Sequence, residues 1–188
     1  MDINMNDVFH LKTPLSSEDI EPLRSGDRIT ISGILYTARD AAHRRLVEFI
    51  ETGIELPIPI DGQIIYYVGP SPAPPGRVIG AAGPTTSYRM DTYTPRLLEL
   101  GLKGMIGKGK RSNDVIEAIV KHRAVYMAAI GGAGALMARA VKYARVVAYE
   151  DLGPEAIREL MVEKLPAIVV NDIRGNDLYI QGQKDYQL

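Results

Sequence analysis

Residues 103–130 read KGMIGKGKRSNDVIEAIVKHRAVYMAAI, and this stretch decides the class of fold. Short apolar runs at Lys103–Ile106 and Ala124–Ile130 predict two strands, and Asn113–His122 between them predicts a helix. A strand, a helix and a strand in this order are typical of parallel neighbours joined by a right-handed crossover. The stretch therefore predicts an α/β protein.

The same alternation continues on both sides. Arg28–Ala38 predicts a strand, Arg39–Thr52 a helix that ends at Gly53, and Gly62–Gly69 another strand. Because the N-terminal part is richer in strands, we expect a single domain over residues 1–188 with a largely parallel sheet and an added β layer. The remaining predicted elements are strands at Arg77–Ala81, Arg145–Tyr149 and Ala167–Asn171, and helices at Met90–Leu100, Ala133–Val141 and Pro154–Leu160.

A proline-rich run, GPSPAPPG at Gly69–Gly76, interrupts this pattern. Prolines fix φ and remove backbone donors, so the run predicts neither strand nor helix. It is consistent with a linker between domains and equally with a rigid loop that crosses between two sheets.

The composition excludes several classes of function. Lys and Arg number 22 against 23 Asp and Glu, a net charge of -1, so any anion site must be local, and neither nucleic acid nor a membrane is an expected partner. The chain has no cysteine, so it forms no disulfide and supplies no thiolate to zinc or to an iron–sulfur cluster. The polar start, Met1–Lys12, and the strand-sized apolar runs predict no signal peptide or membrane span, and hence a cytoplasmic location.

Three cations fall at junctions between predicted elements. Arg39 lies where the first long strand meets its helix, and Lys108 follows a strand. Arg89 lies where the strand predicted at Arg77–Ala81 gives way to the helix predicted from Met90. Ligands of open α/β sheets bind at the carboxyl ends of strands, where helix N-termini also favour anions. A single Arg or Lys in a loop is most often only solvated. The convergence of three such junctions predicts a carboxylate or phosphate site.

Other candidate sites have weaker patterns. Gly131-Gly132-Ala133-Gly134 follows a predicted strand as a dinucleotide loop does, but Met137 replaces the third glycine of that fingerprint. Nucleotide binding through this loop therefore remains an alternative function of the chain. The three histidines are scattered, which argues against a histidine metal site, and His43 suits a surface or hydrogen-bonded histidine better than a ligand.

Several motifs carry a resemblance to a known family. The most specific are GAAGPTTSYRMD at Gly80–Asp91 and GMIGKGKRS at Gly104–Ser112, which together occur in the same order as in the C-terminal domain of class I fumarases. They are equally similar to the separate β subunits of two-subunit fumarases and of L-tartrate dehydratase. Further matching segments are LYTARDAAHRR at Leu35–Arg45, IGGAGALMA at Ile130–Ala138 and LPAIVVNDIRGNDLY at Leu165–Tyr179.

The resemblance implies a hydro-lyase that reversibly adds water to the C=C bond of a dicarboxylate, as in the conversion of fumarate to malate. It also implies a swivelling β/β/α domain and a 4Fe–4S cluster whose cysteines belong to a partner α subunit, so the chain is expected in a hetero-oligomer. By the resemblance, Arg39, Arg89 and Lys108 bind the substrate carboxylates and Thr85 is the catalytic base. A threonine hydroxyl is a poor base without an activating group, which we expect on the partner chain.

Two rival readings remain beside the fumarase β subunit. One is a tartrate dehydratase β subunit, because one hydroxyl or methyl changes only a few pocket contacts. The other is a carboxylate-binding or assembly module without catalysis. Since the chain lacks cysteine, both a catalytic subunit and such a module predict no cluster chemistry by the chain alone.

Overall fold

A computed structural model describes residues 8–129 and 132–184 of the chain. Its centre is one seven-stranded sheet with the strand order β1-β2-β3-β4-β5-β7-β6. The strands are β1 (Val8–Lys12), β2 (Arg28–Thr37), β3 (Ile64–Tyr66), β4 (Gly104–Gly107), β5 (Val125–Ala128), β6 (Val141–Ala148) and β7 (Ile157–Asn171).

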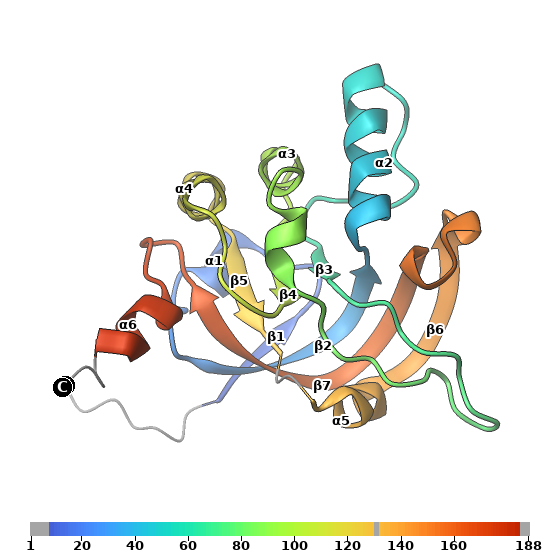
Figure 1. The fold of residues 1–188 in the computed structure, drawn as a ribbon. Coiled ribbons are helices and arrows are strands. Elements are labelled where there is room, and N and C mark those ends of the chain that lie inside the picture. The colour runs from blue at the N-terminus through green and yellow to red at the C-terminus, as the bar shows by residue number, and fades with distance from the viewer. Residues whose placement is uncertain (1–7, 130–131, 185–188) are drawn as a thin grey trace.

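The sheet returns on itself. Strands β1 to β5 are parallel to their successive neighbours, whereas β7 is antiparallel to β5, β6 and β2. The pairings therefore form a cycle from β2 through β3, β4 and β5 to β7 and back to β2, with β1 and β6 attached outside it. Figure 1 shows β7 as a long curved strand that sweeps beneath the other strands.

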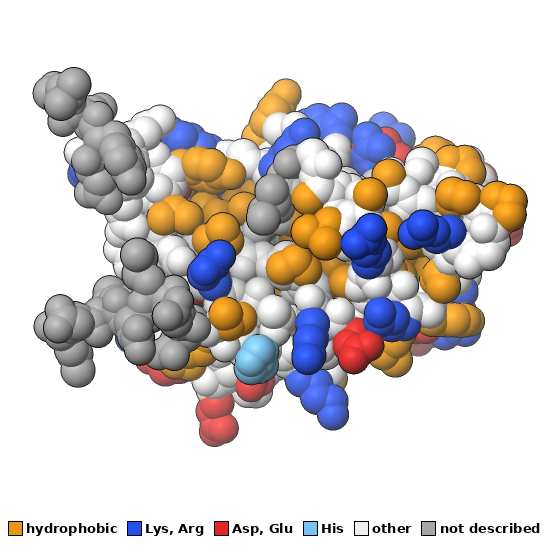
Figure 2. All heavy atoms as spheres, turned by 90° about the horizontal axis from the view of Figure 1, so that it is seen from below, with side chains coloured by type: hydrophobic (Ala, Val, Ile, Leu, Met, Phe, Trp, Pro, Cys, Tyr) orange, Lys and Arg blue, Asp and Glu red, His pale blue; other side chains and the backbone are white. Residues whose placement is uncertain are grey.

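Helices cover the sheet unequally. Helices α2 (Asp40–Thr52), α3 (Thr94–Glu99) and α4 (Asn113–His122) lie along one side of the sheet, at the top of Figure 1, and α5 (Gly134–Ala140) lies beneath it. The view from below shows apolar side chains spread over that face with lysine and arginine among them (Figure 2). The other helical segments are α1 (Ser17–Ile20), α6 (Leu178–Lys184) and the 3-10 helices η1 (Ser87–Met90) and η2 (Glu150–Glu155).

Two buried clusters hold these layers together, and strand periodicity divides residues between them. Ile64 and Tyr66 of β3 belong to the first cluster, which the closed sheet surrounds. This cluster also includes Leu35, Ile106 and Leu160. Ile65 and Tyr67 alternate with them and face the second cluster, which packs against α2, α3 and α4. Because successive side chains of a strand point to opposite faces, β3 contributes to both cores.

Local sequence explains where the covering helices begin and end. Gly53 ends α2 with a left-handed φ of 70°, and its N–H bonds back to the helix carbonyls. Ser112 caps α4, its hydroxyl accepting a hydrogen bond from the N–H of Val115, and Asp114 places negative charge in the first turn. These predicted helices, Arg39–Thr52 and Asn113–His122, are confirmed to within a residue.

Two predicted elements are wrong. Arg77–Ala81 is not a strand, because Ala81 instead closes a loop, with its N–H 2.8 Å from Ser71 Oγ. Pro154–Leu160 is not a helix: Gly153 turns sharply, and β7 begins at Ile157. The tail Ala167–Asn171, predicted as a separate strand, is the end of the same β7.

Other predictions need smaller corrections. The helix predicted at Met90–Leu100 is divided into η1 and α3, with Pro95 in the first turn of α3. The sheet is mixed rather than largely parallel, because every pairing of β7 is antiparallel. Among the described residues the strands form no separate layer, so the added β layer is part of the single sheet. Gly69–Gly76 belongs to a loop rather than a domain linker, since Ser71 N–H bonds to Ala81 O.

Candidate functional site

The carboxyl ends of three adjacent parallel strands bring together residues that are distant in the sequence. Arg39 follows β2, and Lys108 follows β4. Thr85 occupies the corresponding place beyond β3, because its N–H donates to the Tyr67 carbonyl at 2.7 Å. The N–H of Lys108 in turn donates to the Thr85 carbonyl at 3.2 Å. The convergence predicted for Arg39 and Lys108 at one edge of the sheet is therefore confirmed, and Thr85 lies between them.

Arg39 is held in a close-fitting place at the start of α2. A Cβ on Gly69 would lie 2.7 Å from Arg39 Nη1, so the absence of a side chain there makes room for the guanidinium. Arg39 Nη2 lies 3.2 Å from Glu155 Oε1, and the arginine side chain is only 22% exposed. Its position is therefore fixed by the backbone near Gly69 on one side and by a carboxylate on the other.

Glu155 also contacts the backbone at the start of α2. Its Oε2 accepts a 3.0 Å hydrogen bond from the N–H of Ala41 in the first turn of α2. A carboxylate at a helix N-terminus satisfies a free donor and favours the helix dipole. The sequence analysis missed Glu155, because it lay within the helix predicted at Pro154–Leu160, whereas it is the last residue of η2.

Arg89 is placed differently from the prediction. It lies in η1 rather than after a strand, since Arg77–Ala81 forms none. Its Nη2 donates a 2.6 Å hydrogen bond to Thr85 Oγ1, and its Nε lies 3.4 Å from Asp40 Oδ1. Arg89 thus links the threonine to the start of α2.

Asp40 lies between the two arginines and was also missed by the sequence analysis. Asp40 Oδ1 pairs with Arg89, while Asp40 Oδ2 lies 4.0 Å from Arg39 Nε. Both Arg39 Nε and Asp40 Oδ2 are buried atoms with no hydrogen-bond partner among the described residues. Two arginines and two carboxylates therefore meet here, and their charges balance.

Lys108 joins this group through its backbone. Its carbonyl accepts a 2.9 Å hydrogen bond from the N–H of Ser87, and Lys108 forms an isolated parallel bridge with Thr86. The residue is exposed, and its ammonium forms no ion pair or hydrogen bond within residues 8–129 and 132–184. A compact charge on a flexible stem can therefore turn toward an anion.

His43 lies behind the site and is inaccessible to solvent. Its Nδ1 is 2.9 Å from the Arg39 carbonyl, and its ring packs edge-on against Tyr67. Burial lowers the pKa of His43 from 6.5 to about 4, so the ring is neutral at neutral pH. His43 is thus a buried, hydrogen-bonded histidine, as expected, and it supports the backbone of Arg39.

Other classes of site find little support. The chain has no cysteine, and residues 8–129 and 132–184 contain no group of His, Asp and Glu that could hold a metal ion, so these residues do not fit an iron–sulfur cluster. The nucleotide reading rests partly on residues 130–131, which lie outside the described residues. None of the helices in the described ranges has the length and apolar character needed to cross a membrane.

Together, the mixed sheet and the covering helices define an α/β domain with charged residues at the carboxyl ends of its parallel strands. A sequence model described as "Fumarase C-terminus" matches residues 2–182. The chain belongs to this family.

The most informative relatives differ in length. The chain is 42% identical over 156 residues to a class I anaerobic fumarate hydratase of Escherichia coli K12, covering 82% of this chain and 28% of that protein. It is 36% identical over 173 residues to fumarate hydratase 2 of Leishmania major, covering 90% and 30%. It is 35% identical over 176 residues to a putative L(+)-tartrate dehydratase subunit beta of Methanocaldococcus jannaschii, covering 90% of both chains. The chain thus spans under a third of the two fumarate hydratases.

Proposed function

We propose that this chain is the β subunit of a hydro-lyase that reversibly hydrates fumarate to malate. In this proposal a cysteine-bearing α subunit holds the 4Fe–4S cluster, and the present chain supplies the cations that bind the dicarboxylate. The observation that carries it is the meeting of Arg39, Thr85 and Lys108 at the ends of β2, β3 and β4, with Arg89 bonded to Thr85. The names of the fumarate hydratase relatives support the same reaction.

The residue types suit that substrate. A C4 dicarboxylate carries two charges, and removal of a proton beside a carboxylate adds negative charge in the transition state. Arginine can donate two parallel hydrogen bonds to a carboxylate, which suits Arg39 and Arg89. Fixed cations that bind this charge more strongly in the transition state than in the ground state lower the barrier.

Asp40 and Glu155 give the arginines their orientation before substrate arrives. Each carboxylate is between a quarter and a third exposed, so the pairs are partly solvated and exchangeable. An incoming carboxylate would replace Asp40 as the partner of Arg89 without requiring the cation to move far. Orientation of this kind reduces the reorganisation needed in the reaction.

Thr85 is the proposed base. The Arg89 guanidinium donates directly to Thr85 Oγ1, and this contact would stabilise negative charge on the oxygen that takes up the substrate proton. An activating group was expected on the partner chain, whereas Arg89 provides one such contact within this chain. The hydroxyl's own proton acceptor belongs to the assembled enzyme in this proposal.

Tartrate dehydration is the second candidate. The relative from Methanocaldococcus jannaschii is named a putative L(+)-tartrate dehydratase subunit beta, and the match covers 90% of its length and 90% of this chain. A separate β subunit is therefore represented among the relatives. The same cations would bind tartrate, which differs from malate by one hydroxyl.

The assembly is part of the same proposal. A hetero-oligomer in the cytoplasm would place the cluster of the α subunit opposite the strand ends of β2, β3 and β4. The swivelling of the domain would then be a rigid movement against the α subunit that opens and closes the site.

The decisive experiment mixes the purified chain with a cysteine-bearing α subunit reconstituted anaerobically with iron and sulfide. We expect hydration of fumarate only in the mixture. Dehydration of tartrate is measured in parallel as the alternative activity. Robust turnover by the iron-free chain alone would contradict the partnership. A complex that assembles and binds dicarboxylate without any turnover would favour the non-catalytic module.

A further inference from the structure

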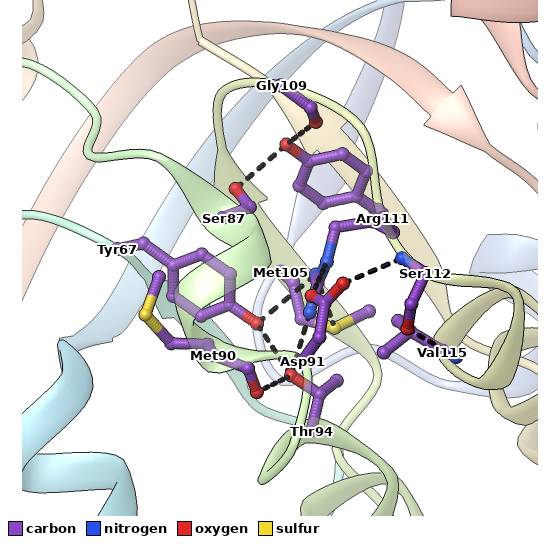
Figure 3. Close-up of polar contacts among 11 residues, drawn as sticks. Tyr67, Ser87, Met90, Asp91, Thr94, Met105, Gly109, Arg111, Ser112 and Val115 are labelled. Atoms are coloured by element: carbon purple, nitrogen blue, oxygen red, sulfur yellow. Dashed lines mark hydrogen bonds and ion pairs between the residues drawn. The ribbon is translucent and has the colours of Figure 1, made fainter.

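Arg111 is a buried arginine between β4 and α4, three residues after Lys108, and Figure 3 draws it with its polar partners. Its side chain is 0% exposed, and its Nε donates to Asp91 Oδ1 at 2.7 Å. Its Nη2 donates to Thr94 Oγ1 at 2.7 Å. Arg111 belongs to the KGKRS motif, but unlike the exposed Lys108 it is buried, and it is not among the residues proposed to bind the substrate carboxylates.

Aromatic rings enclose the same guanidinium. Its carbon lies 5.4 Å from the ring centre of Tyr67 and 4.9 Å from that of Tyr126, within the range of cation–π contacts. Tyr67 follows β3, and Tyr126 lies in β5. Arg111 therefore contacts a residue of β5 and the residue that follows β3, as well as the segment after η1.

Asp91 connects the two loops of the site through both carboxylate oxygens. Oδ1 accepts from Arg111, and Oδ2 accepts a 2.6 Å hydrogen bond from the N–H of Ser112, the cap of α4. Asp91 directly follows η1, which contains Arg89. Figure 3 shows these contacts of Asp91 with Arg111 and Ser112, which bond the end of η1 to the segment that leads into α4.

Tyrosine hydroxyls fix the residue next to Lys108. Tyr126 donates a 2.8 Å hydrogen bond to the Gly109 carbonyl, and the Gly109 N–H donates to Tyr179 Oη at 3.1 Å. The hydroxyl of Tyr126 also lies 2.9 Å from Ser87 Oγ. Gly109 has φ +86, a conformation that other residues adopt only with strain.

A buried ion pair adds little net stability over apolar residues of similar volume. Its main effect here is geometric, because Arg111 and Asp91 determine how two loops meet. We propose that Arg111 is a positioning residue, which with Asp91 and Tyr126 holds the Lys108 loop against the Thr85–Arg89 segment. The proposal rests on the proposed function, since it assigns Arg111 to the geometry of that site.

The first test uses the isolated chain and needs no activity. Two backbone hydrogen bonds, from Lys108 N–H to Thr85 O and from Ser87 N–H to Lys108 O, report the contact between the loops. Arg111→Gln should accelerate hydrogen exchange at the Lys108 and Ser87 amides by about tenfold or more, with little change at β7 amides such as Val169. Arg111→Lys should show a smaller effect, because the lysine ammonium can replace only some of the hydrogen bonds that the guanidinium donates.

Arg96→Gln is the matched control, since Arg96 is an exposed arginine of the neighbouring α3. It should leave the exchange of both amides as in the parent chain. Unchanged exchange in Arg111→Gln, or equal acceleration throughout β7, would overturn the positioning role, the latter because it indicates general destabilisation.

The second test uses the complex with the α subunit. A displaced Lys108 loop should raise KM for the dicarboxylate by about fivefold or more as well as lower kcat. A partly unfolded population would lower kcat alone and leave KM unchanged, which would contradict the proposal. If the parent complex has no activity, the proposed function fails, while the exchange result still decides whether Arg111 orders the two loops.

Discussion

Nη2 of Arg89 donates a 2.6 Å hydrogen bond to Oγ1 of Thr85. The same guanidinium lies 3.4 Å from Asp40 through its Nε. One arginine thus contacts both the proposed base and a carboxylate at the start of α2. Charge binding and proton transfer are therefore coupled in the proposed site, and separate substitutions are needed to distinguish them.

The Thr85 hydroxyl can be removed without changing the shape of the side chain. Thr85→Val should lower kcat in the assembled enzyme by about 10²-fold or more, because the proposed proton acceptor is lost. Thr85→Ser retains the oxygen and should keep measurable turnover. The measurement is exchange of the substrate C–H proton with solvent deuterium, alongside kcat.

Thr86→Val is the matched control for this position, since Thr86 is the adjacent threonine and has no hydrogen bond from Arg89 among the described residues. It should retain turnover close to that of the parent. Parental exchange and turnover in Thr85→Val would exclude Thr85 as the base and leave it a structural role.

The three cations should affect catalysis far more than stability. Arg39→Ala, Arg89→Ala and Lys108→Ala should each lower kcat/KM by about 30- to 4,000-fold, the usual cost of truncating a charge-assisted contact to a buried partner. The ion pairs of Arg39 and Arg89 are partly exposed, and Lys108 forms none within the described residues, so each melting temperature should change little. Lys12→Ala and Lys121→Ala serve as controls outside the site. Comparable losses of kcat/KM in these variants would show that Arg39, Arg89 and Lys108 do not form a specific substrate-binding site.

Acid should weaken the fold through His43. Its pKa is about 4 in the folded protein against 6.5 for a solvated histidine, so the unfolded chain binds the proton first as pH falls. The stabilisation is therefore present above pH 6.5 and is lost toward pH 4, amounting to about 2 kcal/mol by pH 5. Denaturant unfolding at pH 7 and pH 5 measures this difference.

His43→Gln should remove this component, so that its unfolding free energy falls less between the two pH values. His10→Gln, which replaces an exposed histidine of β1, is the matched control. An identical pH dependence in His43→Gln and the parent would show that another group is responsible.

Gly107 permits the close crossing of the two site loops. A Cβ there would collide with Ser87 Oγ and lie 2.9 Å from a ring carbon of Tyr67. Gly107→Ala should therefore destabilise the chain by about 1–3 kcal/mol, measured by thermal unfolding. Gly182→Ala, in α6 with open space around it, should be neutral or slightly stabilising. Equal melting temperatures for the two variants would argue against a tight crossing at Gly107.

The sequence predicts much of the local structure because short-range patterns determine it. The apolar spacing of α4, with Ser112 before it, is contained within a few residues and gives the right helix. The failures have a different cause. Ile157–Leu160 lacks a strong strand pattern of its own, and it becomes part of β7 through pairing with the distant β2 and with the preceding strand β6.

The candidate site shows the same division. Placement of Arg39 and Lys108 at one sheet edge follows from the rule for parallel strands, and it could be predicted. Asp40 and Glu155 could not be identified as counter-ions of the two arginines, because those pairings depend on how η1 and η2 pack on the start of α2. Likewise, the Thr85–Tyr67 hydrogen bond closes a long proline-rich loop that no local pattern determines.

The closure of the sheet also has a consequence for the order of folding. Arg28 of β2 pairs with Ile168 of β7, so this contact joins segments separated by most of the described chain. Contacts between distant segments carry a large loop-closure cost and slow the folding rate. During synthesis, β2 leaves the ribosome long before β7, and its β7 edge stays unpaired in that interval. We therefore expect the nascent chain to depend on chaperones until residues 157–171 emerge.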